Sequence, residues 1–201
     1  MKIVVACLGD SITAGSPAWD PDPKVRAAIS QPDPQSQFEY WAAEVDPRLE
    51  FRNYGVYGER TEEIALRLTA AAKGAHTLIV QGGINDIAQE RSVQQAAENL
   101  GALVVRGKEL RLQVALANVL PWNNGYPNAE GPIRSLNGLI EEIGVEEDVP
   151  VLDFHEALED PERPGRMPED WTSDGAHPSV AGYRRLGEVV LLRGLWGPPP
   201  N

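Results

Sequence analysis

Short apolar runs alternate with helix-periodic stretches along almost the whole of this chain. Five runs have the length of buried strands, and strand-breaking residues follow them. Strands that are apolar throughout are typical of parallel sheets with both faces covered. The alternation therefore predicts an α/β fold, a three-layer α/β/α sandwich around a five-stranded parallel sheet. The predicted strands are residues 3–8, 49–54, 77–81, 113–117 and 149–153.

Between these strands, four stretches repeat apolar residues every three or four positions. This period places the apolar side chains on one face of a helix, which can then pack on the sheet. Right-handed crossovers through such helices join parallel strands. The predicted helical stretches are residues 64–72, 93–104, 133–143 and 183–190.

Three longer segments interrupt the alternation, at residues 16–37, 120–132 and 160–168. All three follow the carboxyl ends of predicted strands, where α/β proteins bind ligands, so we expect them to rim the functional site. The polar content of the first two favours a shallow cleft over an alkyl tunnel. The final Gly-Pro-Pro-Pro-Asn, residues 197–201, is predicted to be a frayed tail.

Composition narrows the class of protein. The 201 residues are 42% hydrophobic and 24% charged, which fits one globular domain over residues 1–201. The net charge of -12 repels nucleic-acid phosphates and anionic membrane surfaces, so we expect no nucleic-acid partner. No apolar run approaches the roughly 20 residues of a membrane-spanning helix, so we expect no membrane insertion. Nothing in the pattern specifies an oligomeric state.

Cys7 is the only cysteine, and it lies within the first apolar run, where we expect a small buried hydrophobic residue. That run follows Met1 and Lys2, a beginning that a secretory leader would share. Because the run ends in a polar turn with no cleavage-type stretch, we interpret it as a strand and expect a cytoplasmic protein.

The first apolar run ends in Gly9, Asp10 and Ser11. A buried strand that breaks into a tight turn lifts the Ser11 side chain above the carboxyl edge of the sheet. A serine hydroxyl is a weak nucleophile at neutral pH and needs a base. The pattern makes Ser11 a candidate nucleophile, and an ordinary turn or helix cap is the alternative.

Three histidines are candidates for the base. His76 precedes the third predicted strand, at the end opposite the candidate site, where we expect a surface residue. His155 follows the fifth predicted strand and remains an alternative on its position. His177 is preferred, because Asp174 lies three residues before it and Gly175 allows the backbone to turn. The carboxylate can then hold the imidazole in the tautomer that accepts a proton, and a capped helix start is the alternative.

Two further motifs accompany these residues: Asn-Tyr-Gly-Val-Tyr-Gly, which ends at Gly58, and Gly-Ile-Asn-Asp, which contains Asn85. Together with the blocks around Ser11 and His177, they resemble the SGNH hydrolases, also called the GDSL esterase and lipase family, from residue 2 to about residue 192. The resemblance implies a flavodoxin-like sheet of order 2-1-3-4-5, with Ser11 as nucleophile and Asp174 and His177 as the relay. It also implies an oxyanion hole formed by Gly58, by Asn85 and by the backbone N–H of Ser11.

The chemistry of the oxyanion candidates agrees with these roles. Gly58 offers a backbone N–H that no side chain blocks, and Asn85 offers an uncharged amide N–H. Each such donor can contribute about 2.7 to 4 kcal/mol. A turn before a helix at Thr61 and an Asx-turn at Asn85 are the alternatives. We expect Asp10 and Asp86, which adjoin these motifs, to fix the loops in place.

An acidic metal site is the main rival interpretation. Asp10, Asp86, Asp153 and Asp174 all lie near the predicted carboxyl edge, where carboxylates can hold Mg²⁺. The sequence has no paired-His metal spacing and no Gly-rich phosphate loop that ends in Lys-Ser or Lys-Thr. We therefore expect neither a metal nor a cofactor.

The sequence predicts a serine esterase that cleaves small carboxylic esters with short acyl groups through an acyl-enzyme. Trp122 follows the fourth predicted strand and Trp171 precedes Asp174, so both are candidates for the substrate pocket, with local core packing as the alternative. The resemblance leaves lysophospholipase, acyl thioesterase and carbohydrate deacetylase activities open. A ligand-binding module without catalysis is a minor alternative, because a fold does not fix a function.

Overall fold

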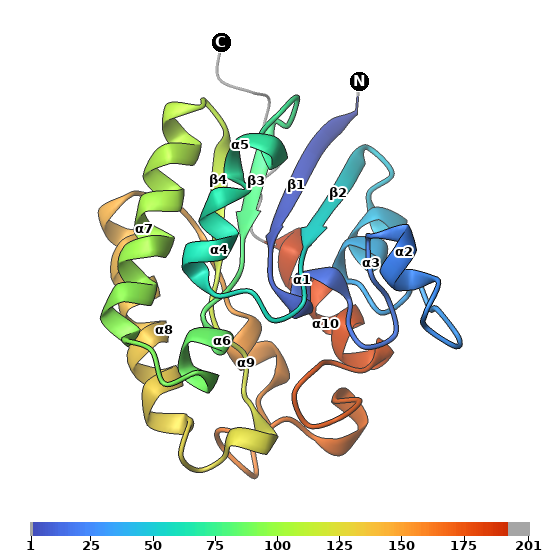
Figure 1. The fold of residues 1–201 in the computed structure, drawn as a ribbon, viewed down its shortest axis with the longest axis vertical. Coiled ribbons are helices and arrows are strands. Elements are labelled where there is room, and N and C mark those ends of the chain that lie inside the picture. Colours follow the sequence, from blue (N-terminus) through green and yellow to red (C-terminus); the bar gives the residue numbers. More distant parts are fainter. Residues whose placement is uncertain (1, 193–201) are drawn as a thin grey trace.

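Figure 1 shows the computed structural model, which describes residues 2–192. Five parallel strands form one sheet in the order β2-β1-β3-β4-β5, which confirms the predicted fold and strand order. The predicted tail at residues 197–201 lies outside the described residues. The strands are β1 (Ile3–Gly9), β2 (Leu49–Gly55), β3 (Thr77–Val80), β4 (Gln113–Ala117) and β5 (Val151–Leu152).

The side chains of β1 alternate between two hydrophobic cores. Ala6 and Leu8 belong to one core, and Val5 and Cys7 belong to the core on the other face of the sheet. All four are fully buried. A strand covered on both faces has no solvent side, which is why this stretch of sequence is apolar throughout and why Cys7 is buried, as predicted.

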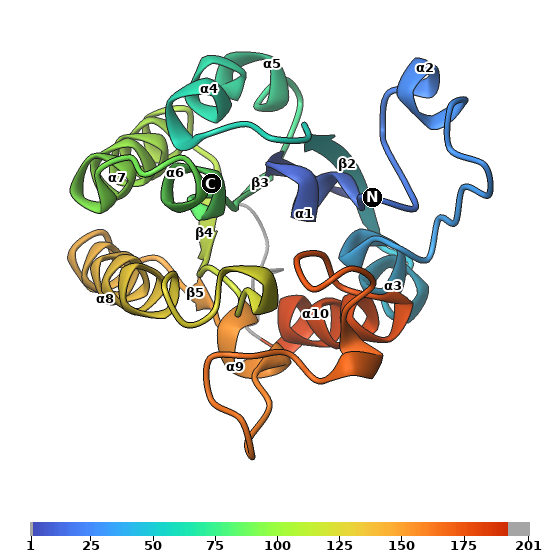
Figure 2. The same cartoon turned by 60° about the horizontal axis from the view of Figure 1, so that its bottom comes forward.

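Helices cover both faces of the sheet (Figure 2). α4, α5, α7 and α8 pack on one core, and α3, α9 and α10 pack on the other. None of the helices within residues 2–192 combines the length and the apolarity needed to span a bilayer. The helices are α1 (Ser11–Ala14), α2 (Pro23–Arg26), α3 (Phe38–Val45), α4 (Thr61–Leu66), α5 (Leu68–Ala71), α6 (Ile84–Ala88), α7 (Val93–Glu109), α8 (Glu130–Glu146), α9 (Phe154–Leu158) and α10 (Val180–Leu192), with 3-10 turns η1 (Asn123–Gly125) and η2 (Glu169–Trp171).

Several elements differ from the sequence prediction, which does not include α1, α2, α6 or α9. The helical stretch at residues 64–72 is split into α4 and α5 at Arg67, whose N–H donates to the carbonyl of Ile64, three residues back, at 3.1 Å. β5 is two residues long rather than five, and only those two residues pair with β4. α3 is not predicted by the apolar pattern, because its eight residues span too few turns to show a repeat.

Candidate active site

Ser11 lies where β1 turns into α1. Asp10 caps this short helix, because its Oδ1 accepts a hydrogen bond from the N–H of Ile12 at 2.9 Å. Gly9 leaves room for the turn, since a Cβ at this position would clash with the Thr13 side chain. Ser11 is only 5% exposed. The strand and the capped helix therefore hold its hydroxyl in one place at the carboxyl edge of the sheet.

His177 reaches Ser11 from 166 residues away in the sequence. Its Nε2 lies 3.0 Å from the Ser11 Oγ, and its Nδ1 lies 2.7 Å from Oδ2 of Asp174. A carboxylate only accepts hydrogen bonds, so it fixes the ring proton on Nδ1 and leaves Nε2 free to accept the serine proton. The structure thus joins Ser11, His177 and Asp174 in one chain of hydrogen bonds.

Asp174 is anchored by the backbone of the loop that it shares with His177. Its Oδ1 accepts hydrogen bonds from the N–H groups of Ala176 at 2.9 Å and of His177 at 2.8 Å. Partial burial opposes ionisation of Asp174, but the hydrogen bonds from His177 and Ala176 outweigh it and hold the pKa of this carboxyl below its usual 3.8. Asp174 is therefore ionised at neutral pH and orients the imidazole.

Asn124 holds this loop from outside. Its Nδ2 donates to the carbonyl of Asp174 at 2.8 Å, and its backbone N–H donates to the carbonyl of Gly175 at 3.2 Å. Gly175 has a φ of +82°, and a Cβ there would clash with the Asn124 side chain. The loop before α8 therefore positions the relay, a role that no local pattern in the sequence indicates.

Asp10, which precedes the nucleophile in the sequence, is fully buried. Its Oδ2 has no hydrogen-bond partner. Burial raises the pKa of Asp10 to about 6, although the hydrogen bonds from Ile12 and Gln81 and the charge of His177 oppose the rise. Asp10 thus caps α1 and also interacts electrostatically with the imidazole of His177.

The two other oxyanion candidates come together from separate loops. Gly58 follows β2 with a φ of +79°, and a Cβ there would meet no atom within 4 Å. Asn85 lies in the first turn of α6, after β3, and its Nδ2 donates to the carbonyl of Glu59 at 2.9 Å. The amide of Asn85 and the backbone beside Gly58 are therefore neighbours, as a shared oxyanion site requires.

Asp86 fixes the loop that carries Gly58. The two carboxylate oxygens of Asp86 accept hydrogen bonds from the backbone N–H of Thr61 at 3.0 Å and from the Thr61 hydroxyl at 2.9 Å. Asn99 of α7 donates to the same hydroxyl at 3.0 Å. Burial raises the pKa of Asp86, although the hydrogen bonds from Thr61 oppose this. These contacts anchor the start of α4, and with it the end of the Gly58 loop.

Two contacts at the site have no counterpart in the sequence analysis. Tyr57 stacks on the His177 ring, with ring centroids 6.0 Å apart and planes 29° apart, although Tyr57 is 67% exposed. The guanidinium of Arg67 donates to the carbonyl of Gly9 at 2.9 Å and to Glu59 at 2.8 Å. Tyr57 lies within the quoted motif, but only the fold shows that it faces the relay.

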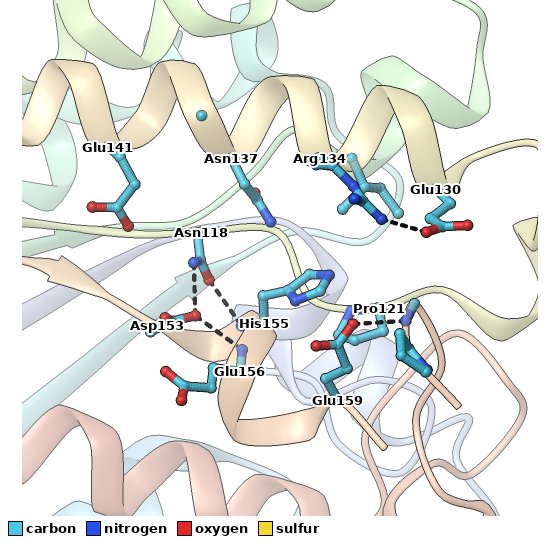
Figure 3. Close-up of a pocket in the computed structure, with 14 residues that line it drawn as sticks. Asn118, Pro121, Glu130, Arg134, Asn137, Glu141, Asp153, His155, Glu156 and Glu159 are labelled. Carbon is cyan, nitrogen blue, oxygen red and sulfur yellow. Dashed lines mark hydrogen bonds and ion pairs between the residues drawn. The ribbon is translucent and has the colours of Figure 1, made fainter. Parts of the chain in front are cut away.

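The other two histidines lie elsewhere. His76 is partly exposed, and its Nδ1 accepts a hydrogen bond from the N–H of Val4 at 3.0 Å. His155 lines a separate cavity with α8 residues (Figure 3), and its backbone N–H donates to Asn118 Oδ1 at 2.8 Å. Of the three histidines, it is His177 whose Nε2 accepts the hydrogen bond from the Ser11 hydroxyl.

The four acidic candidates for a metal site have separate hydrogen-bond partners. Asp153 Oδ1 accepts hydrogen bonds from Asn118 Nδ2 and from the N–H of Glu156, both at 2.9 Å. Asp10, Asp86 and Asp174 have the partners given above. Within residues 2–192, no group of three or more His, Cys, Asp or Glu side chains is arranged to hold a metal ion.

The two tryptophans take part in local packing. Trp122 lies against the core beneath α7 and α8, and its ring fills the space that a Cβ at Gly125 would need. Trp171 packs against the opposite core under the guanidinium of Arg185, which lies 4.0 Å from the ring centroid. Their role in a substrate pocket stays a prediction.

Comparisons with known proteins find a matching family and similar folds. The sequence model of the GDSL-like lipase/acylhydrolase family matches residues 7–185 of this chain. A search of curated protein sequences finds no match. Among solved structures, a lipolytic protein of the G-D-S-L family from Desulfitobacterium hafniense has a TM-score of 0.76 at 21% identity, over 94% of this chain and 98% of that chain.

Two further solved structures are similar over nearly the whole chain. A lipase/acylhydrolase from Enterococcus faecalis has a TM-score of 0.71 at 24% identity, over 94% of this chain and 93% of that chain. A variant of an acetyl xylan esterase from Geobacillus stearothermophilus has a TM-score of 0.70 at 19% identity, over 95% of each chain. At these identities the structural similarity concerns the fold.

Proposed function

The chain belongs to the GDSL-like lipase/acylhydrolase family, and from this premise we propose that it is a serine esterase that cleaves small carboxylic esters through an acyl-enzyme on Ser11. The observation that carries the proposal is the continuous hydrogen-bonded chain from Ser11 through His177 to Asp174. A nucleophile within reach of a base, with that base oriented by a carboxylate, is the arrangement that acyl transfer needs.

In the first half of the reaction, the Ser11 Oγ attacks the ester carbonyl carbon while Nε2 of His177 takes the hydroxyl proton. The C–O bond to the leaving group then breaks, and His177 gives that proton to the departing alcohol. In the second half, water attacks the acyl-enzyme, with His177 again accepting and returning a proton. The products are one carboxylic acid and one alcohol.

The oxyanion of each tetrahedral intermediate is bound by N–H donors in this proposal. The donors are the backbone N–H groups of Ser11 and Gly58 and the side-chain amide of Asn85. Asn85 is already held beside the Gly58 loop by its hydrogen bond to Glu59, so little reorganisation is needed during the reaction.

We propose acetyl-type esters as substrates. The loop at residues 120–132 is polar and adjoins the relay through Asn124, which supports a shallow cleft rather than a tunnel for a long alkyl chain. The similar fold of an acetyl xylan esterase supports the same substrate class. Lysophospholipase and acyl thioesterase activities are the alternatives for this site.

Two measurements test the proposal. A fluorophosphonate probe should label the protein once, and Ser11→Ala should lose both labelling and turnover, whereas His155→Ala should keep both. A series of p-nitrophenyl esters from two to sixteen carbons should show the highest kcat/KM at acetyl or butyryl. Labelling that survives Ser11→Ala would refute the nucleophile, and a maximum at ten carbons or longer would refute the short-chain assignment.

A further inference from the structure

A cavity of about 660 Å³ lies between α8 and the segment that begins with α9, and Figure 3 shows side chains that line it. Its floor is formed by Asn118 and Asp153, which follow β4 and β5. Side chains of α8 form one wall and side chains of α9 form the other. Its volume is typical of a site for a small molecule, and the carboxyl edge of a parallel sheet is where such sites form.

Three groups that line this cavity have no hydrogen-bond or ion-pair partner within residues 2–192. They are the carboxylates of Glu141 on α8 and Glu156 on α9, and the imidazole ring of His155, of which only the backbone N–H is bonded. The other charged groups of the lining are already engaged. Arg134 pairs with Glu130 at 2.5 Å, and Glu159 accepts the N–H of Gly165 at 2.7 Å.

The charges of the lining define the class of ligand. Five carboxylates face one guanidinium, namely those of Glu130, Glu141, Asp153, Glu156 and Glu159 against Arg134. The carboxylates are spread along both walls, and within residues 2–192 they form no cluster that could hold a metal ion. Charge spread over a volume of this size suits an extended organic cation, with ammonium groups that meet different carboxylates.

Gly138 keeps the wall of the cavity open. It lies inside α8 and lines the cavity, and a Cβ there would meet no atom within 4 Å. Packing therefore does not require glycine at this position, although glycine destabilises the interior of a helix relative to alanine. A side chain here would meet open space at the cavity.

We propose that this cavity is a second binding site, distinct from the Ser11 site, for a small linear polyamine. Its ammonium groups pair with Glu141 and Glu156, and the imidazole of His155 accepts one further N–H. The site does not depend on the proposed esterase activity, because none of these residues takes part in the Ser11 relay.

Isothermal titration calorimetry with spermidine tests the proposal on the intact protein. Spermidine should bind with a stoichiometry of one, and 1,8-octanediol, which lacks the charges, should not bind. Gly138→Leu should weaken binding by narrowing the cavity. The matched control is Gly131→Leu, because Gly131 lies on the same helix with equally open surroundings but does not line the cavity.

Charge variants keep the test independent of any effect of leucine on folding. Glu141→Gln and Glu156→Gln should each weaken binding by roughly two- to five-fold, the loss expected for a partly exposed ion pair. Glu142→Gln, on α8 outside the cavity, and Ser11→Ala should leave binding unchanged. Binding that is equally strong in Gly138→Leu, or that is equally weakened by Glu142→Gln, would show nonspecific attraction to the acidic surface and overturn the proposal.

Discussion

Glu39 provides the sharpest test of the energetics of this fold. It lies on α3, only 4% exposed, and neither carboxylate oxygen accepts a hydrogen bond from an N–H or O–H group. Burial raises the pKa of Glu39 to about 8, although interactions with its own backbone N–H and with the Cys7 thiol oppose the rise. Burial, together with the charge of Glu39, also raises the pKa values of Cys7 and Tyr183. The folded protein therefore keeps Glu39 protonated at neutral pH.

The sign of the effect on stability follows from proton binding. Below pH 4.5 the carboxyl of Glu39 is protonated in both the folded and the unfolded state, so its ionisation does not lower the free energy of unfolding. Between pH 4.5 and about 8, only the folded state retains the proton, and the free energy of unfolding falls by about 1.4 kcal/mol per pH unit. Over that interval, the total loss attributable to Glu39 is about 5 kcal/mol.

Urea unfolding followed by circular dichroism, at pH values from about 5 to 9, measures this loss. Glu39→Gln keeps the size of the protonated side chain but cannot ionise, so the difference in unfolding free energy between variant and wild type should grow as the pH rises. Glu44→Gln, on the exposed side of the same helix, is the matched control. Its free energy of unfolding should change with pH as that of wild type does. Parallel curves for wild type and Glu39→Gln between pH 5 and 8 would refute the reasoning.

Three further predictions concern the candidate site. Asp10→Asn keeps the cap of α1 but removes a buried carboxylate whose pKa is about 6, so at pH 8 it should unfold with a free energy up to about 3 kcal/mol higher than wild type. The kcat of Asp10→Asn should nevertheless fall about 10-fold, because the anion that favours the His177 imidazolium is lost. Melting curves at pH 5 and 8 check the stability, and ester kinetics check kcat. Asn124→Ala frees the loop that carries Asp174 and should lower kcat/KM by about 10-fold or more. Fluorophosphonate labelling of this variant should be slower but still complete. An unchanged labelling rate would contradict the positioning role of Asn124. Tyr57→Ala should lower kcat/KM by about 3- to 10-fold while Tyr57→Phe retains it, and equal losses in both would assign the effect to the hydroxyl instead of the stacked ring.

The sheet was predictable because each inner strand is buried on both faces and is therefore an unbroken apolar run. β1 shows this directly, since Val5, Ala6, Cys7 and Leu8 are all fully buried. β5 pairs with β4 over only two residues at the edge of the sheet, so the apolar run around it is longer than the strand. Apolar runs report burial, and burial extends beyond the residues that form ladder hydrogen bonds.

The hydrogen-bonded chain at Ser11 was also accessible from the sequence, because its members lie in short motifs at the ends of predicted strands. The residues that position it were not. Asn124 acts on Gly175 across 51 positions, and Tyr57 meets His177 across 120, and neither contact leaves a local pattern. Glu39 lies within an apolar segment as an ordinary acidic residue, and only the packing of α3 shows that it is buried.

The division of the relay between two parts of the molecule has a consequence for inactivation by heat. Ser11 is attached to an inner strand, while His177 and Asp174 lie on a loop that hydrogen bonds from Asn124 fasten to a neighbouring loop. Such a loop can open with a smaller free energy than the whole fold. Warming should therefore separate base from nucleophile while the sheet is still intact, so that turnover declines reversibly at temperatures below the unfolding midpoint.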